Sequence, residues 1–292
     1  MSSIHSVGIT ANRGISGVET AVRKAIAVIE PTGCEILMDG ELDDWLGLGY
    51  GAGELSQFAP RCQLILVFGG DGTFLRAARS LDSLQVPLLG INAGGLGFLT
   101  VLRRTEFEPT LRRILAGEYQ IENRMRLKAT LIRAGETLGE HTALNDAVMR
   151  MGHSNRLVEF SIAVGGQYLG GYRADGLIVA TPTGSTAYSM SAGGPIVHPT
   201  MDALVATPIC PHALAIRPLV AGAGEQFEIR IGGRSGEAAL HVDGTMKVWL
   251  MRDDIIRISQ AEGRLPMLLP RDFSYYALVR DKLGWGGVPA KD

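Results

Sequence analysis

A single aspartate among glycines follows an apolar run in the segment Val67-Phe68-Gly69-Gly70-Asp71-Gly72-Thr73. Glycines let backbone N–H groups approach a phosphate closely, and the first turn of the helix predicted next adds about half a positive charge. A carboxylate at this point repels phosphate unless it holds a metal ion or takes a proton from a reacting hydroxyl. The segment therefore predicts either a phosphate loop of Gly69, Gly70, Gly72 and Thr73 beside a reactive Asp71, or a tight turn in which Asp71 or Thr73 caps the helix.

A second glycine-rich loop, Gly90-Ile91-Asn92-Ala93-Gly94-Gly95-Leu96-Gly97-Phe98, follows the next apolar run. Loops at the carboxyl ends of neighbouring parallel strands form a crevice, which is where open α/β sheets bind ligands. The alternative is a wide loop supported by hydrogen bonds of Asn92. Neither loop reads GxGxxG and no GxxxxGK[ST] occurs, so the dinucleotide fingerprint and the P-loop are both excluded.

Two further polar segments lie in the C-terminal half. Leu144-Asn145-Asp146 contains an Asn-Asp pair, which more often forms a turn than a site. The segment 172–195 carries Arg173 and Asp175 and places seven hydroxyl side chains among the eleven residues 181–191. That density supplies many donors and acceptors for a sugar or an adenine ring. The alternative is a loop whose hydroxyls are satisfied internally.

The elements that must position these residues alternate over the first 120 residues. Apolar runs predict buried strands, and helical spacing of apolar residues predicts helices between them. This alternation indicates an α/β domain with a parallel sheet. We expect strands at Ile4–Thr10, Cys34–Met38, Gln63–Phe68 and Val86–Ile91, and helices at Val18–Glu30, Thr73–Leu81 and Glu106–Ala116.

Short strands dominate from about residue 121, which indicates an all-β domain, a sandwich. The predicted domains are 1–120 (α/β, nucleotide-binding), 121–270 (β-rich) and a tail, 271–292, that packs back on the first domain. We expect strands at Phe160–Val164, Leu177–Ala180, Ala213–Ile216, Phe227–Ile231, Leu240–Val242, Val248–Met251 and Ile255–Ile258.

Composition excludes several classes of protein. The 28 basic and 30 acidic residues give a net charge of −2, so neither nucleic acid nor a membrane surface is an expected partner. The three scattered cysteines show no CxxC and the six histidines show no ligand spacing, so no zinc site is predicted. No signal peptide or membrane span is visible, and a cytoplasmic location is expected.

The order of these motifs, closing with Val242-Asp243-Gly244 and Lys282-Leu283-Gly284-Trp285, resembles the NAD kinase family over about residues 5–285. The first motif is shared with phosphofructokinases and lipid kinases, whereas the hydroxyl-rich segment narrows the resemblance to NAD kinase. The resemblance implies an α/β domain followed by a β-sandwich, assembled as a homo-oligomer (dimer or tetramer). It also implies ATP-dependent phosphorylation of the adenosine ribose 2′-hydroxyl of NAD, giving NADP.

By position, the resemblance makes Asp71 the proton acceptor. The NAD contacts that it implies are Asp71, Gly72, Arg76, Asn145, Asp146, Arg156, Arg173, Asp175, Thr186, Ala187, Tyr188, Ser189, Met190, Ser191, Asp243 and Thr245. In the family, a polar or charged side chain at the place of Arg173 goes with enzymes that accept NAD and reject NADH, and glycine goes with enzymes that accept both NAD and NADH. No Walker lysine is present, so a divalent cation such as Mg²⁺ is expected with ATP, and no protein residue is assigned to it.

This chain departs from the family pattern at three places: Asp146 stands where Glu is common, Thr245 where Gln is common, and Ala93 where Arg is frequent. Two other functions remain open. One is a related kinase acting on a lipid or sugar, against which the polar segment 181–191 argues. The other is a non-catalytic NAD(P) sensor, which would have no need of Asp71.

Overall fold

The computed structural model describes residues 4–81, 84–95, 97–152, 156–232 and 237–285 of the 292. The chain divides into two compact units. Unit 1 comprises residues 1–123 and 265–292, and unit 2 comprises residues 124–264.

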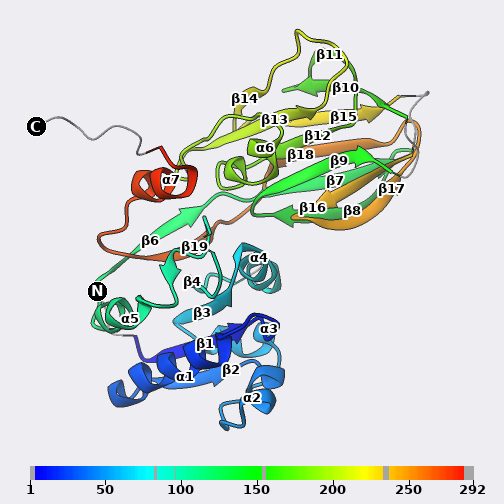
Figure 1. The fold of residues 1–292 in the computed structure, drawn as a ribbon. Helices are drawn as coiled ribbons and strands as arrows, with labels where there is room; N and C mark the ends of the chain where they lie inside the picture. The colour runs from blue at the N-terminus through cyan, green and yellow to red at the C-terminus, as the bar shows by residue number, and fades with distance from the viewer. Residues whose placement is uncertain (1–3, 82–83, 96, 153–155, 233–236, 286–292) are drawn as a thin grey trace, which may run out of the picture. The chain divides into compact units, whose positions relative to one another are not determined.

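Unit 1 is built on a seven-stranded sheet with the order β2-β1-β3-β4-β19-β6 and with β5 beside β4 (Figure 1). Neighbours pair in parallel from β2 to β19, as the alternation of strands and helices predicts. The strands are β1 Ser6–Ala11, β2 Glu35–Met38, β3 Leu64–Gly69, β4 Leu88–Asn92, β5 Leu102–Arg103, β6 Tyr119–Arg124 and β19 Leu265–Pro270. The helices are α1 Val18–Ile29, α2 Gly40–Leu46, α3 Leu55–Phe58, α4 Asp71–Ser80, α5 Phe107–Leu115 and α7 Tyr275–Leu283.

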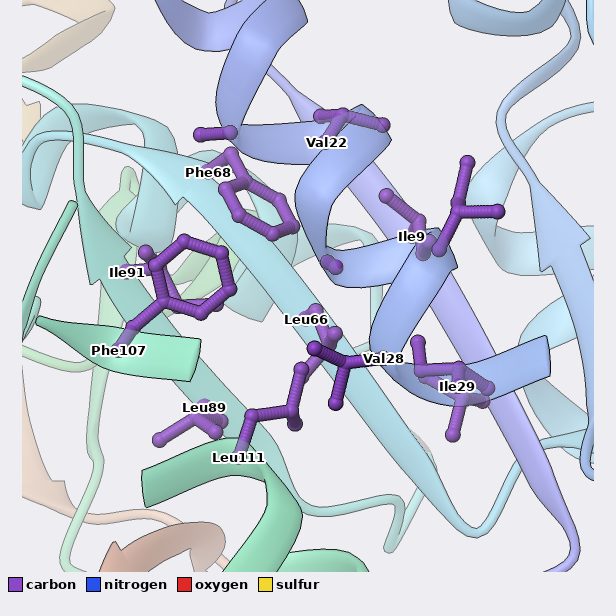
Figure 2. Close-up of a cluster of buried hydrophobic side chains, with 14 of the residues drawn as sticks. Ile9, Val22, Val28, Ile29, Leu66, Phe68, Leu89, Ile91, Phe107 and Leu111 are labelled. Atoms are coloured by element: carbon purple, nitrogen blue, oxygen red, sulfur yellow. The ribbon is translucent and has the colours of Figure 1, made fainter. Parts of the chain in front are cut away.

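The core of unit 1 packs α1 and α5 against one face of this sheet. Figure 2 shows alternate residues of β3, Leu66 and Phe68, beside Val22 of α1 and Phe107 of α5. The rings of Phe68 and Phe107 meet edge to face with centroids 5.9 Å apart. Because every residue of β3 is buried, this strand is fixed on both faces and holds the loop that follows it at a defined place.

Unit 2 is a sandwich of two six-stranded antiparallel sheets, ordered β11-β10-β15-β18-β7-β8 and β14-β13-β12-β9-β16-β17. One apolar core takes residues from both sheets, including Phe160 and Ile229 from the first and Leu177 and Leu240 from the second. The predicted α/β plus β-sandwich fold is confirmed. The strands are β7 Leu127–Arg133, β8 Glu136–Ala143, β9 Asp146–Met151, β10 Val158–Val164, β11 Gln167–Ala174, β12 Gly176–Ala180, β13 Ala203–Ile209, β14 Leu219–Gly222, β15 Phe227–Ile231, β16 Ala238–Val242, β17 Thr245–Leu250 and β18 Ile255–Gln260, with one short helix, α6 Tyr188–Ser191.

The outer face of the second sheet carries a smaller apolar cluster. Val148, Ile178 and Val205 pack there with Val197, and Ala192 lies against them. The segment that follows β12 therefore lies over this face, and β12 is buried throughout.

The structure differs from the sequence-based expectations at two places. Ala213–Ile216 is a turn rather than a strand, in which Ile216 N–H donates to the Ala213 carbonyl at 3.3 Å and Leu214 is 92% exposed. The strand of this region is β13, which contains Pro208. The neighbouring β14 pairs only with Ala203–Ala206, so no ladder bond to β14 is lost at the proline.

The boundary between the units also falls elsewhere than expected. Residues 265–270, which the predicted boundary assigns to the second domain, form β19 in the sheet of unit 1, where Met267 pairs with Leu88 of β4. The final helix α7 belongs to unit 1 as well, and Lys282 lies 5.7 Å from the centroid of the Phe98 ring. Residues 286–292 of the predicted tail lie outside the described residues.

Candidate functional site

The two glycine-rich loops of unit 1 lie next to each other. The parallel register of β3 and β4 pairs Gly69 with Asn92, so both loops leave the sheet at the same edge, as predicted. Gly70 precedes the first residue of α4, which is Asp71, and Thr73 and Arg76 follow on the same helix. Asp71, Gly72 and the phosphate-loop residues are thus brought together at one strand–helix junction.

The carboxylate of Asp71 does not cap its own helix; it reaches the second loop. Its Oδ2 accepts the N–H of Phe98 at 2.9 Å. Its Oδ1 accepts the N–H of Leu99, the N–H of Thr100 and the hydroxyl of Thr100, each at 3.1 Å. Sequence reasoning missed this role, because the donors are mostly backbone groups 27–29 residues away.

Asn92 supports the second loop, as the alternative interpretation of that loop expected. Its Nδ2 donates to the Gly95 carbonyl at 2.7 Å and to Thr100 Oγ1 at 2.8 Å, and its Oδ1 accepts Gly94 N–H at 2.7 Å. Asn92 and Thr100 are both buried. The loop is therefore held from two sides, by Asn92 and by Asp71.

A cavity of about 890 Å³ lies within unit 1 at the carboxyl ends of β1 and β2. Its walls include Asn12 and Arg13 after β1, Asp39 after β2, and Arg76 of α4. In the order β2-β1-β3-β4 the chain passes from β1 to β2 on one side of β1 and then to β3 on its other side, so the topological switch point, where open α/β sheets bind ligands, lies between β1 and β3, next to this cavity. Arg13 is paired with Glu41 at 2.5 Å.

In unit 2, Asp243 fixes the Asn145-Asp146 segment. Its Oδ1 accepts the N–H groups of Asn145 and Asp146 at 2.8 and 3.2 Å, and its Oδ2 accepts the N–H of Leu144 at 2.9 Å. Asp243 adopts a left-handed backbone conformation (φ 46°) and donates its own N–H to the Asp146 carbonyl at 3.0 Å. A role for Asp243 as a direct NAD contact stays a prediction, since its carboxylate already serves this turn.

The side chains of Asn145 and Asp146 are buried, with 9% and 5% of their surface exposed, and accept or donate no hydrogen bond among the described residues. Burial raises the pKa of Asp146 from 3.8 to about 7, and the negative charge of Asp243 raises it further. A buried carboxylate without a protein partner is costly unless something else supplies donors, which is what a ligand with two adjacent hydroxyls does.

The hydroxyl-rich segment 181–191 is largely satisfied internally, which is the alternative that the sequence left open. Ser185 Oγ donates to the Pro182 carbonyl at 2.6 Å and accepts Val197 N–H at 2.9 Å, and Ser189 Oγ lies 2.8 Å from Thr207 Oγ1. Further hydroxyl bonds within unit 2 involve Thr181, Thr183 and Thr186. Two hydroxyl residues of this segment, Tyr188 and Ser191, are exposed. Ala187, which precedes Tyr188, and Met190, which precedes Ser191, are half-buried.

Gly184 fixes this segment against the Asn-Asp turn. A Cβ at Gly184 would overlap the backbone carbonyl of Asn145. Thr181 bonds to the same turn, because its N–H donates to the Asn145 carbonyl at 2.8 Å and its hydroxyl donates to the Leu144 carbonyl at 2.5 Å. Asn145, Asp146, Asp243 and the first residues of the segment 181–191 are thus brought together where the neighbouring strands β9, β12 and β16 of the second sheet begin or end.

Arg173 and Asp175 lie at the other end of β12. Arg173 faces Glu159 across β10 and β11, and its Nε lies 3.2 Å from Glu159 Oε1. Asp175 lines a cavity of about 630 Å³ within unit 2 together with Tyr188, His241 and Trp249, and the last two were not foreseen from the sequence. Burial lowers the pKa of His241, and the charge of Arg150 lowers it further. Arg156 and Thr245 are exposed.

The described residues hold no group of three or more His, Cys, Asp or Glu side chains that could bind a metal ion. No helix of the described part of the chain is long and apolar enough to cross a membrane.

A glycine-rich strand–helix junction carrying a carboxylate, in an α/β unit joined to a β-sandwich, defines a nucleotide-dependent phosphotransferase. The ATP-NAD kinase N-terminal and C-terminal domain models match residues 52–119 and 144–269. NAD kinases of Thiobacillus denitrificans and Pseudomonas fluorescens are each 38% identical, over 283 and 288 residues, covering 97% and 98% of this chain and 97% of each relative. The chain belongs to the NAD kinase family.

Two solved structures are similar to this chain. A yeast NADH kinase complexed with NADH superposes with a TM-score of 0.89 at 25% identity, covering 100% of this chain and 91% of its own. An NAD kinase from Archaeoglobus fulgidus in complex with ATP superposes with a TM-score of 0.71 at 23% identity, covering 96% of this chain and 97% of its own. The second likeness supports the fold.

Proposed function

We propose that this chain transfers the γ-phosphate of ATP to the 2′-hydroxyl of the adenosine ribose of NAD, giving NADP and ADP. In this step a bond forms between the 2′-oxygen and the γ-phosphorus, and the bond from that phosphorus to the bridging oxygen of ADP breaks. The hydroxyl proton goes to Asp71, which later releases it to water. General-base assistance of this kind contributes typically 10²–10⁴-fold in rate.

The observation that carries this proposal is the placement of the Asp71 carboxylate. It stands at the first turn of α4, beside Gly69, Gly70 and Gly72, and its hydrogen bonds to the described residues all run to the loop after β4. The glycines leave backbone N–H groups open to phosphate oxygens, and the helix start favours negative charge there. Asp71 thus has the phosphate loop as its immediate neighbour in sequence and in space.

Recognition of the acceptor is assigned to unit 2. The buried carboxylate of Asp146 and the amide of Asn145 have no hydrogen-bond partner among the described residues. An ionised carboxylate can accept a bond from a ribose hydroxyl other than the reacting 2′-hydroxyl, whose single proton goes to Asp71, and such a bond is stronger than one between neutral groups. A lipid acceptor is not favoured, because the surroundings are polar, and a pure sensor would not require Asp71.

The cavity of unit 1 is the proposed place for the donor nucleoside. It lies at the carboxyl ends of β1 and β2, next to the topological switch point between β1 and β3, and α4 supplies both Asp71 and the wall residue Arg76. Arg76 forms no ion pair among the described residues and is exposed, so its guanidinium is open to a phosphate. The assignment of Arg76 to NAD rather than to the donor stays a prediction.

A divalent cation, Mg²⁺ or similar, is proposed to enter with ATP. The described residues fit this role because they offer oxygen ligands near the phosphate loop but no carboxylate cluster that would hold the ion alone. When bound, the cation neutralises charge on the triphosphate. The protein contributes the N–H groups of the phosphate loop and the carboxylate of Asp71.

A homo-oligomeric state and a cytoplasmic location are also proposed. Exposed apolar side chains on β17, among them Trp249 and Met246, support self-association, since a sheet edge with exposed apolar residues favours pairing with another chain. The three free cysteines, Cys34, Cys62 and Cys210, support a reducing compartment. Light scattering during size-exclusion chromatography tests the homo-oligomeric state: a mass near that of the 31.2 kDa monomer would contradict it.

The function is tested by one turnover assay that crosses two donors, ATP and polyphosphate, with two acceptors, NAD and NADH, in the presence of Mg²⁺. We expect NADP from ATP and NAD, with the new phosphate assigned to the 2′-position by ³¹P NMR. Phosphorylation of a lipid or sugar with no NADP formed would favour a related kinase. Tight NAD binding with no turnover by any donor would favour a sensor.

A further inference from the structure

The hydrogen bonds of Asp71 divide its two oxygens into different roles. A carboxylate oxygen has two lone pairs, so Asp71 offers about four acceptor sites. Oδ1 is contacted by three donors, the N–H groups of Leu99 and Thr100 and the Thr100 hydroxyl, whereas Oδ2 is contacted by Phe98 N–H alone. Among the described residues, Oδ2 is therefore the oxygen with an acceptor site left for a substrate hydroxyl.

The hydroxyl proton of Thr100 has a defined direction. Asn92 Nδ2 is a donor only, so the Thr100 oxygen must accept from it at 2.8 Å and point its own proton at Asp71 Oδ1, 3.1 Å away. The orientation of the Asn92 amide is fixed in turn, because its Oδ1 faces Gly94 N–H and its Nδ2 faces the Gly95 carbonyl. Asn92, Thr100 and Asp71 thus form a chain of hydrogen bonds in one direction: Asn92 donates to Thr100, and Thr100 donates to Asp71.

This chain of bonds is enclosed. Thr100 is 0% exposed and Asn92 is 2% exposed, so water does not compete for these groups. Gly97 closes over the carboxylate, and a Cβ at that position would overlap Asp71 Oδ1. Asn92 and Thr100 form the buried part of this network, and hydrogen bonds that are shielded from water fix their side chains more firmly than exposed ones would.

We propose that Asn92 and Thr100 are positioning residues for Asp71: they hold Oδ1, so that Oδ2 is the atom that takes the proton of the acceptor hydroxyl. The inference rests on the proposed function and adds to it two residues and the identity of the reacting oxygen. Pre-organised positioning of a base matters because small displacements of a reacting group lower the rate strongly.

The test uses Thr100→Val, which keeps the shape of the side chain and removes its hydroxyl, with Thr100→Ser as the matched control that keeps the hydroxyl. We expect Thr100→Val to lower kcat about tenfold, with the KM values for NAD and ATP changed less than twofold. Thr100→Ser should stay within about threefold of the wild type. If the valine variant does not fold, Thr100→Ala removes the same hydroxyl and gives the same readout.

A double-mutant cycle separates positioning from a general structural effect. In an Asp71→Asn background, Thr100→Val should lower the remaining rate less than twofold, because the group through which it acts is gone. Equal kcat in Thr100→Val and wild type, or the same tenfold loss in both backgrounds, would overturn the proposal. Either result would leave the proposed function standing if the wild type forms NADP, whereas absence of NADP from the wild type would overturn the function itself.

Discussion

Binding of NAD should depend on pH through the ionisation of Asp146. Its pKa is raised from 3.8 to about 7 because the carboxyl group is buried and lies near the charge of Asp243. Ribose hydroxyls donate to the ionised form, so the protein binds NAD best when Asp146 is charged. At pH 6 about one tenth of the molecules carry the charge, and at pH 8 about nine tenths do, so the affinity should rise roughly tenfold over this range.

Isothermal titration calorimetry with NAD and without ATP measures this dependence directly. Near pH 7 binding should release about half a proton, which is seen as a heat that varies with the ionisation enthalpy of the buffer. Asp146→Asn is the matched control, because it keeps the shape of the side chain and removes the titration. A wild-type affinity that is flat between pH 6 and 8, or the same slope in Asp146→Asn, would refute this reasoning.

The same pKa shift has a consequence for stability. In the unfolded chain the pKa of Asp146 is 3.8, whereas in the folded protein it is about 7. The free energy of unfolding therefore falls as the pH rises from about 4 to 7, and the whole cost of ionising the buried carboxyl group is present above pH 7. A shift of this size corresponds to about 4 kcal/mol. Asp146→Asn should therefore raise the free energy of unfolding at pH 8 by up to about 4 kcal/mol, and by much less at pH 4; an unchanged urea midpoint at pH 8 would contradict this.

Three further outcomes are expected. Gly184→Ala, whose Cβ overlaps the Asn145 carbonyl, should destabilise by about 2–4 kcal/mol in urea unfolding, whereas Gly222→Ala, which meets nothing within 4 Å, should change stability by less than about 0.5 kcal/mol. Arg173→Gly should gain turnover with NADH and keep turnover with NAD; if Glu159→Gln, which breaks the same ion pair, gains it too, the pair rather than the bulk of Arg173 sets the preference. Removal of divalent cations with EDTA should abolish turnover, and added Mg²⁺ should restore it, while calorimetric NAD binding persists.

The local part of the fold was predictable from the sequence because it depends on local patterns. Buried strands such as β3 are continuous apolar runs, and the helix after it follows a change to helical spacing. The return of β19 to the sheet of unit 1 has no such signal, since strand pairing over a large separation leaves no mark on either segment. The helix α3 did have a local sequence signal, because Glu54 and Gln57 form a capping box at its start, but the sequence analysis did not use this signal.

The site was predictable in residue identity and less so in the role of each residue. Asp71 and Asp243 were assigned to substrate, yet each carboxylate also holds the backbone of a distant loop, through donors 27–29 and 97–99 residues away. Backbone donors have no sequence signature, so these roles emerge only in the folded protein. The hydroxyl-rich segment shows the converse, because its composition suggested ligand contacts while most of its hydroxyls bond within unit 2.

The central claim is that Asp71 takes the proton of the NAD hydroxyl during phosphoryl transfer. The most direct test is the rate of NADP formation by Asp71→Asn at saturating NAD and Mg²⁺-ATP, compared with the wild type. Asparagine keeps the shape of the side chain but is no base, so the turnover number should fall at least about 10²-fold. A turnover number within threefold of the wild type would contradict the account and leave Asp71 as an anchor for the loop after β4.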